Sequence, residues 1–156
     1  MKLITNELLE RVTVEAQTSP RRRKNYNFHQ SDESRCNRLL NALEPGTYIR
    51  PHRHLDPEKE ELMVLLRGRM GMVYFDESGS VTETALLAAG GDAFGIDIPS
   101  GTYHSLVCLE PGTVFLEAKA GPYRPFTAEE TAPWAPSEGD AATASYLAGL
   151  EQLFIS

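Results

Sequence analysis

The chain has 156 residues, of which 41% are hydrophobic, so it can bury one sizeable core, and its length predicts a single domain over residues 1–156. The formal net charge of −7 argues against a general nucleic-acid binder, because phosphate recognition needs a concentrated basic face. Acidic residues within the first ten positions and the lack of an 18-residue apolar run argue against a signal peptide and a membrane partner. Cys36 and Cys108 show no disulfide or metal-motif spacing. We therefore expect a cytoplasmic protein.

The first predicted element is a short N-terminal helix. Thr5 is a suitable N-cap for a helix that reaches about Gln17 and ends near Pro20. Four basic residues follow at Arg21–Lys24. A solvated loop is the simpler interpretation of this run, and a role in shielding a pocket or in meeting a partner subunit is the alternative. Residues 1–26 are thus predicted to form a helix and a basic loop.

Short strands are predicted over most of the remaining chain, separated by Gly and Pro turns. They are expected at residues 35–42, 48–52, 62–67, 71–75, 81–87, 93–98, 104–108 and 114–119. Strands of this length and spacing predict an all-β barrel or sandwich, with its core over residues 27–123. Residues 124–156 are predicted to form a Pro-rich loop and then a helix between Asp140 and Phe154, which packs on the barrel or on a partner.

Three histidines and one glutamate indicate a metal site. His52 and His54 alternate along a predicted strand, so their side chains share one face, and Glu61 opens the next strand. His104 follows a Pro/Gly turn at the start of another strand. An isolated histidine would be interpreted as a surface residue. Three imidazoles with a carboxylate favour one divalent transition metal (Fe, Mn, Ni, Co, Cu or Zn) over Mg²⁺ or Ca²⁺.

These residues carry a family resemblance. Residues 46–68 resemble the first cupin motif through Gly46, His52, His54, Glu61 and Gly68. Residues 99–104 resemble the second cupin motif through Pro99, Gly101 and His104. Six residues separate His54 from Glu61, where the family usually has three or four. Glu60 could therefore compete for the ligand position, although only Glu61 keeps the family's spacing to Gly68.

Longer segments resemble the WbuC-type cupin-fold metalloproteins of bacteria, namely residues 27–29, 38–54, 109–123 and 132–139. The resemblance implies a double-stranded β-helix (cupin jelly roll) with short terminal helices and a bound metal. The family's name comes from surface-polysaccharide gene clusters, which implies a link to that metabolism. Cupin barrels often pair, so a homodimer is expected by analogy. The resemblance supplies no reaction.

Strand alternation extends the predicted site beyond the metal ligands. If His52 and His54 point into the barrel, Tyr48 and Arg50 share that face. Arg50 is then predicted to clamp an anion, and Tyr48 to transfer protons. Other inward candidates are Met63, Leu106 and Cys108. Glu117 and Lys119 share a face of the last strand, where they either serve as an acid/base group and a substrate-binding group or form an exposed ion pair. His29 is expected to be structural or to lie at the pocket mouth.

Three function hypotheses follow. The first is a metal-dependent isomerase, epimerase or dioxygenase that acts on a small anionic or sugar-like molecule. The second is a non-catalytic, metal-dependent binding or sensing protein, because an open metal position can simply hold a ligand. The third, a metal that only stabilises the fold, is weakest, because a barrel of this size has enough core without it.

Overall fold

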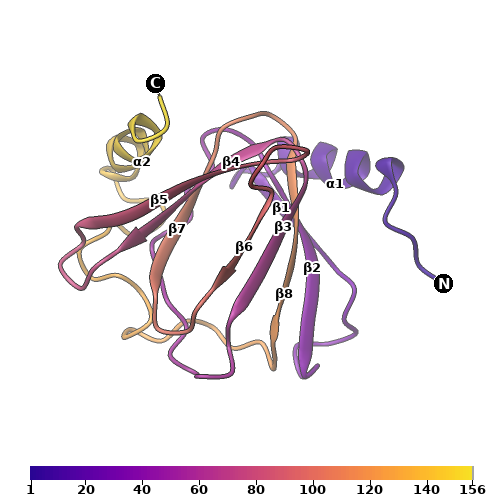
Figure 1. Cartoon of the computed structure of the whole chain (residues 1–156), viewed down its shortest axis with the longest axis horizontal. Coiled ribbons are helices and arrows are strands. Elements are labelled where there is room, and N and C mark those ends of the chain that lie inside the picture. The colour runs from indigo at the N-terminus through magenta and orange to yellow at the C-terminus, as the bar shows by residue number, and fades with distance from the viewer. Residues whose placement is uncertain (156) are drawn as a thin grey trace.

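The computed structural model describes residues 1–155 and contains two helices and eight strands within them (Figure 1). The elements are α1 (Asn6–Thr18), β1 (Arg23–Asn27), β2 (Cys36–Leu43), β3 (Glu61–Arg67), β4 (Arg69–Phe75), β5 (Val81–Ala88), β6 (Gly95–Ile98), β7 (Tyr103–Cys108), β8 (Thr113–Ala120) and α2 (Thr143–Gln152). The prediction of an all-β domain with short terminal helices is confirmed. Neither helix within residues 1–155 is long and apolar enough to cross a membrane.

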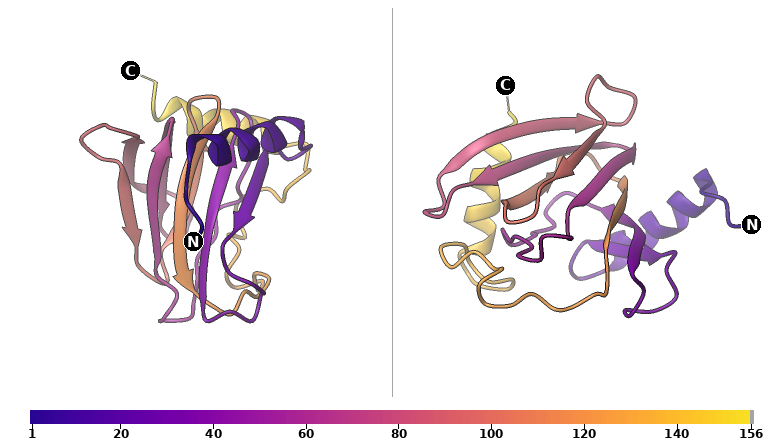
Figure 2. Two further views of the ribbon diagram at one scale, coloured as in Figure 1. Left: turned by 90° about the vertical axis from the view of Figure 1, so that its right-hand side faces the viewer. Right: turned by 60° about the horizontal axis from the view of Figure 1, so that its bottom comes forward.

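The strands form two antiparallel sheets that face each other. One sheet has five strands in the order β1-β2-β8-β3-β6, and the other has three in the order β5-β4-β7. The sheets approach each other where β3 runs into β4 and separate toward the opposite end of the barrel (Figure 1). Helices α1 and α2 lie on opposite sides of the molecule, α1 against the five-stranded sheet and α2 near β7 (Figures 1 and 2).

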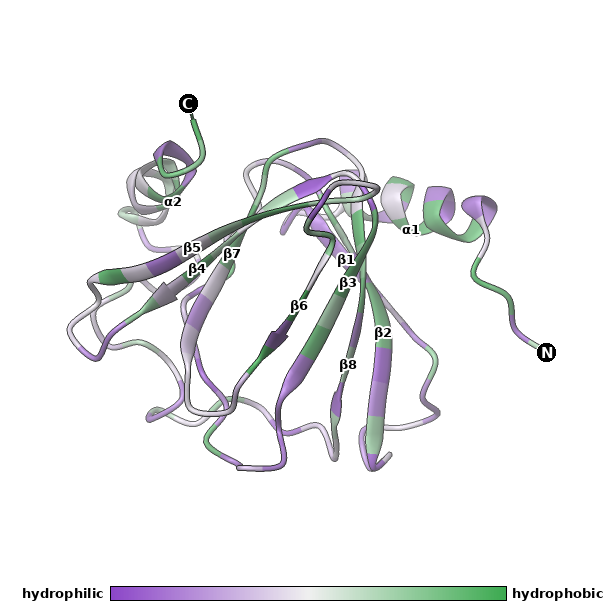
Figure 3. Ribbon diagram, viewed as in Figure 1, coloured by the Kyte–Doolittle hydropathy of each residue, from purple (hydrophilic) through white to green (hydrophobic). Residues whose placement is uncertain are grey.

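Three apolar clusters hold these layers together. The cluster between the two sheets consists of Leu43, Met63, Leu65, Met70, Met72, Leu87, Ile98, Leu106, Cys108 and Phe115. A second cluster lies under α1 and a third joins α2 to β4 and β7. Strands β2 and β3 carry both hydrophilic and hydrophobic stretches (Figure 3). Several polar residues of these two strands are buried, namely Asn37, Asn41 and Glu61.

The corner between β3 and β4 depends on Gly68. Its φ is +80°, a left-handed conformation that side chains disfavour, and a Cβ there would lie only 2.8 Å from the Cα of Thr113. The hydroxyl of Thr113 accepts a hydrogen bond from the backbone N of Arg69 and donates one of 2.7 Å to the carbonyl oxygen of Glu110. The close approach of the Thr113 backbone thus ties β8 to the corner.

Gly68→Ala should lower the free energy of unfolding by roughly 2 to 4 kcal/mol, the sum of left-handed strain and overlap with backbone atoms that cannot give way. Gly90→Ala is the matched control, because Gly90 also has a positive φ, +75°, but a Cβ there meets no atom within 4 Å. Urea denaturation of both variants measures the difference. Equal losses in the two variants would contradict the proposed close packing at Gly68.

Two details of the sequence prediction were wrong. The basic run is an exposed loop only at Arg21 and Arg22, because β1 begins at Arg23, and Arg21 and Arg23 both form ion pairs of 2.8 Å with Glu138. Residues 48–52 form no regular strand, since only His52 makes β-bridges, to His104 and Thr131. The predicted N-terminal helix is confirmed, and the hydroxyl of Thr5 accepts a hydrogen bond from the backbone N of Leu8.

Candidate metal centre

The site is built around a pair of histidines on neighbouring backbone segments. His52 and His104 exchange backbone hydrogen bonds of 3.0 and 2.9 Å. The Nδ1 of each ring lies 2.9 Å from a carbonyl oxygen two residues earlier, that of Arg50 or Thr102. A carbonyl oxygen can only accept, so each Nδ1 carries the hydrogen and each Nε2 keeps a lone pair. The two rings are thereby fixed in the form that binds metals.

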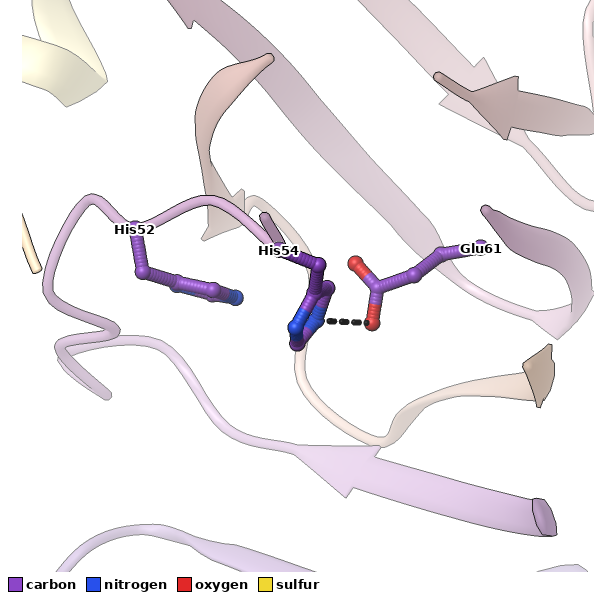
Figure 4. Close-up of side chains that lie close together, drawn as sticks. All are labelled: His52, His54 and Glu61. Carbon is purple, nitrogen blue, oxygen red and sulfur yellow. Dashed lines mark ion pairs between the residues drawn. The ribbon is translucent and has the colours of Figure 1, made fainter. Parts of the chain in front are cut away.

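Glu61 and His54 complete the cluster. The Nε2 of His54 lies 3.0 Å from Glu61 Oε1, and the Nε2 of His104 lies 2.9 Å from Glu61 Oε2. Figure 4 shows the imidazoles of His52 and His54 and the carboxylate of Glu61 directed toward one another. His52, His54 and Glu61 offer ligand atoms that all lie within 4.8 Å of one another. This group could hold a metal ion, and His104 adjoins it.

The contacts to Glu61 are short, but they do not have the geometry of hydrogen bonds. Within the described residues, His54 Nε2, His104 Nε2 and Glu61 Oε2 are buried and have no hydrogen-bond partner. Buried polar atoms without partners are costly, and most native structures avoid them. Three such atoms around one point fit a cation that accepts their lone pairs. The donor set of imidazole and carboxylate suits a transition metal.

The protonation states match that requirement. Burial, and then the neighbouring His104, lowers the pKa of His52 to about 3, so its ring is neutral at pH 7. Burial by itself would raise the pKa of Glu61. Close contacts with His104 and His54, together with the charge of Lys119, nevertheless hold that pKa well below its ordinary value. Neutral imidazole and ionised carboxylate are the metal-binding forms.

A buried ion network extends the site from Glu61 across the sheet. The Nζ of Lys119 lies 2.8 Å from Glu61 Oε1 and 2.7 Å from Glu117 Oε1. The other oxygen of Glu117 accepts a hydrogen bond of 2.8 Å from the side-chain amide of Asn41. Burial lowers the pKa of Lys119, but its two carboxylate neighbours more than offset this and raise it. The ammonium is therefore charged at neutral pH and holds both carboxylates in place.

The cluster opens into a cavity of about 660 Å³. Met63, Leu106 and Phe115 supply apolar lining, and residues of β1, β2 and β8 supply polar lining. The ring centroid of Phe126 lies 4.4 Å from that of His52 and 5.4 Å from that of His54, so Phe126 covers two ligands. A volume of this size accommodates a small organic molecule beside the metal position.

The structure brings together most of the side chains that the sequence indicated. The four metal-ligand candidates converge, and Met63, Glu117 and Lys119 line the same cavity or its network. Glu117 and Lys119 do form an ion pair, but inside the barrel. Leu106 and His29 also line the cavity. The Nδ1 of His29 accepts a hydrogen bond from the backbone N of Arg38, which keeps it away from the metal ligands.

The inward prediction for Tyr48 and Arg50 was wrong. The hydroxyl of Tyr48 donates to the carbonyl of Pro136, and burial raises the pKa of Tyr48. The guanidinium of Arg50 donates to the carbonyl of Ala132 and to the hydroxyl of Ser137. Ile49 lines the cavity in their place. Strand alternation failed because residues 48–51 are not in a regular strand.

Sequence reasoning also missed the inward asparagines of β2 and the aromatic cover. Asn37 and Asn41 alternate with Leu39 and Leu43 along one face of β2, and all four line the cavity. Their spacing of four residues, on a strand face that otherwise carries leucine, was the signal that could have found them. Phe126 lies in an irregular segment that gives no periodic signal.

The comparisons with known proteins first give a family. A family model described as "Domain of unknown function (DUF6016)" matches residues 4–87, more than half of the chain. The chain belongs to this family. The matched part of this DUF6016 member includes His52, His54 and Glu61 but ends before His104. None of the curated proteins matches the chain.

Solved structures give the fold of this DUF6016 member. KdgF from Halomonas sp. is 16% identical with a TM-score of 0.52, covering 69% of this chain and 85% of its own. A conserved protein of unknown function from Streptococcus pyogenes is 17% identical with a TM-score of 0.51, covering 68% and 80%. An oxalate oxidase solved with the substrate analogue glycolate is 12% identical with a TM-score of 0.51, covering 69% and 55%. The chain has the cupin jelly-roll fold.

Proposed function

We propose that this protein is a metal-dependent cupin enzyme that binds a small, hydroxylated or anionic molecule and transfers a proton on it, as isomerases and epimerases do. The observation that carries the proposal is the convergence of two buried imidazole nitrogens and one carboxylate oxygen, which have no hydrogen-bond partner within residues 1–155, beside a cavity of about 660 Å³. A catalytic metal site requires such ligands beside open space, because the protein ligands occupy only part of the metal's coordination shell.

In this proposal the metal is held by His52, His54, Glu61 and His104. Carbonyl acceptors orient His52 and His104, and Lys119 orients Glu61. A divalent ion bound there would polarise a carbonyl or carboxylate oxygen of the ligand as a Lewis acid. Fe, Mn, Ni, Co, Cu and Zn all suit these ligands.

The charge balance of the site supports an anionic ligand. Glu61 and Glu117 carry two negative charges, and Lys119 between them carries one positive charge. Imidazoles that bind a metal do so in the neutral form and add none. A divalent cation would turn the local balance from −1 to +1, so one carboxylate on the ligand would neutralise it. Buried charges are stable only when paired in this way.

Glu117 is the proposed proton-transfer group. Its carboxylate lines the cavity with Met63 and Phe115, and Lys119 and Asn41 fix its orientation through one oxygen each. Each oxygen keeps a second lone pair that can accept a proton. A carboxylate positioned beside a polarised ligand is suited to general base chemistry. This observation favours proton transfer over an oxygenase reaction, which would use the same metal ligands.

Deuterium exchange tests the proposal. The protein, loaded with Zn²⁺, Mn²⁺, Ni²⁺ or, without oxygen, Fe²⁺, is incubated in D₂O with lactate, D-gluconate or D-glucuronate, and proton NMR follows the C–H next to the carboxylate or carbonyl. We expect exchange on at least one of these probes, and a loss of at least about a hundredfold in Glu117→Gln, in line with the removal of a general base. Metal content should be unchanged in that variant.

Glu110→Gln is the matched control, because Glu110 is an exposed glutamate outside the cavity. It should exchange at the wild-type rate. If the probes bind but none exchanges with any metal, the enzymatic proposal is wrong and the protein is a metal-dependent binding module. That alternative uses the same cavity and ligands.

The resemblance to WbuC-type cupins supports a narrower version of the proposal. This resemblance rests on four segments of the sequence. It would connect the ligand to surface-polysaccharide metabolism. A sugar-like molecule with a carboxylate satisfies both this connection and the charge balance of the site. A homodimer in the cytoplasm remains part of the same proposal.

A further inference from the structure

A row of three polar side chains crosses the inner face of the five-stranded sheet. Asn37 of β2 is paired in register with Lys119 of β8, and Lys119 is paired with Glu61 of β3. Residues paired across antiparallel strands place their side chains next to each other on the same face. Asn37 thus lies one strand beyond Lys119 as seen from the metal centre, on a side of the cavity away from the histidines.

Asn37 has an unused acceptor. The residue is 2% exposed and lines the cavity, and its Oδ1 has no hydrogen-bond partner within the described residues. An amide oxygen buried without a partner destabilises the fold, because it has lost its hydrogen bonds to water. The ion network does not relieve this cost, because its donor, Lys119, contacts Glu61 and Glu117 and forms no hydrogen bond with Asn37 within the described residues.

Lys119 has an unused donor beside it. An ammonium group has three N–H donors, and those of Lys119 face one oxygen of Glu61 and one of Glu117. No third acceptor is found within residues 1–155. The cavity wall next to the metal centre therefore offers one free acceptor and one free donor on neighbouring strands.

We infer that Asn37 and Lys119 form a hydroxyl-binding subsite that selects a hydroxylated carboxylate over a plain one. A hydroxyl oxygen accepts from the ammonium of Lys119 while its hydrogen is donated to Oδ1 of Asn37. An alkyl chain satisfies neither group, and a carboxylate can accept but has no hydrogen for Asn37. The inference rests on the proposed function, since the ligand's carboxylate is assigned to the metal.

The spacing fixes where that hydroxyl lies on the ligand. Asn37 and Glu61 are two strands apart, which is roughly 10 Å between backbones. A ligand anchored by its carboxylate at the metal must therefore extend several bonds to reach Asn37. A six-carbon sugar acid has this length, and the cavity of about 660 Å³ accommodates it.

Titration calorimetry of the zinc-loaded protein with D-gluconate and hexanoate tests the inference, because the two probes share a six-carbon chain and a carboxylate and differ in hydroxyls. We expect D-gluconate to bind at least about tenfold more tightly than hexanoate, and Asn37→Leu to lose about tenfold for D-gluconate and nothing for hexanoate. Zinc content should stay at the wild-type level in the variant. Asn37→Ala should show the same selective loss and serves if the leucine variant does not fold.

Gln17→Leu is the control. Gln17 is an exposed side-chain amide on α1 that does not line the cavity. Its affinity for D-gluconate should change less than about twofold, as for a solvated amide. Equal binding of both probes, or no loss in either Asn37 variant, would overturn the subsite and leave the metal proposal intact. If neither probe binds to the wild type, the proposed ligand class itself is wrong.

Discussion

His52→Ala should strip the metal from the protein while the barrel stays folded. His52 provides a lone pair to the centre and little to the apolar core between the sheets, whose residues do not include it. Loss of a ligand should cost more than the ten- to hundredfold in affinity that is typical of groups that only orient ligands. Elemental analysis of protein purified without a histidine tag should fall from about one equivalent of metal to less than about a tenth.

Two further variants test the assignment of individual ligands. His104→Ala should lose the metal as His52→Ala does, since the rings of both residues are oriented by carbonyl oxygens. Glu60→Ala should keep it, because Glu60 is exposed and Glu61 is the buried carboxylate. Circular dichroism checks that each variant is folded. Retention of full metal content in both histidine variants would refute the proposed centre.

Lys119→Met should destabilise the metal-free protein by roughly 3 to 5 kcal/mol, the typical cost of removing one partner from a buried ion pair. The change leaves the carboxylates of Glu61 and Glu117 without their shared counter-charge inside the barrel. Methionine keeps the length of the side chain, so the loss arises from charge and not from a cavity. Urea denaturation in the presence of EDTA measures the free energy of unfolding.

Adding Glu117→Gln to Lys119→Met should recover part of the loss, since one of the two uncompensated charges is removed. The pH dependence gives an independent check. The pKa of Glu61 is depressed in the wild type, so its contribution to stability is present above the unfolded pKa of about 4.3 and is lost as the pH falls through the folded pKa. The gap between wild type and Lys119→Met should therefore narrow below about pH 4. A gap that is constant from pH 7 to pH 3 would contradict the role assigned to the charge.

The metal ligands could be predicted because each has a local sequence marker. His52 and His54 are two residues apart, and Glu61 opens a strand that is recognisable by its apolar run. His104 follows a Pro/Gly turn. Each of these markers lies within a few residues of the ligand, so it can be recognised without knowledge of the fold. The strand positions were predicted for the same reason, with shifts of one or two residues for the segments that do form strands.

Tyr48 and Arg50 could not be placed from the sequence, because their orientation is decided by partners far along the chain. Both donate hydrogen bonds to residues between 132 and 137, a loop whose path follows from the packing of α2. Strand β1 was missed for a similar reason. Its charged residues have low strand propensity, but Arg23 is satisfied by Glu138 and by the carbonyl of Tyr48.

His52 and His104 are paired through their backbones, so the metal centre should tolerate a change in chain length in the segment after His54 but not in the turn before His104. Glu61 is held by β6 on one side and β8 on the other, so residues added to the exposed segment 55–60 can bulge outward without moving it. The chain already has six residues there. The turn at residues 99–102 has no such freedom, because the backbone N of Gly101 donates to the carbonyl of His54 and the carbonyl of Thr102 orients the ring of His104, so an inserted residue would disturb two ligands. Loops grafted to change what this barrel binds should therefore enter after His54 and leave the second turn at its present length.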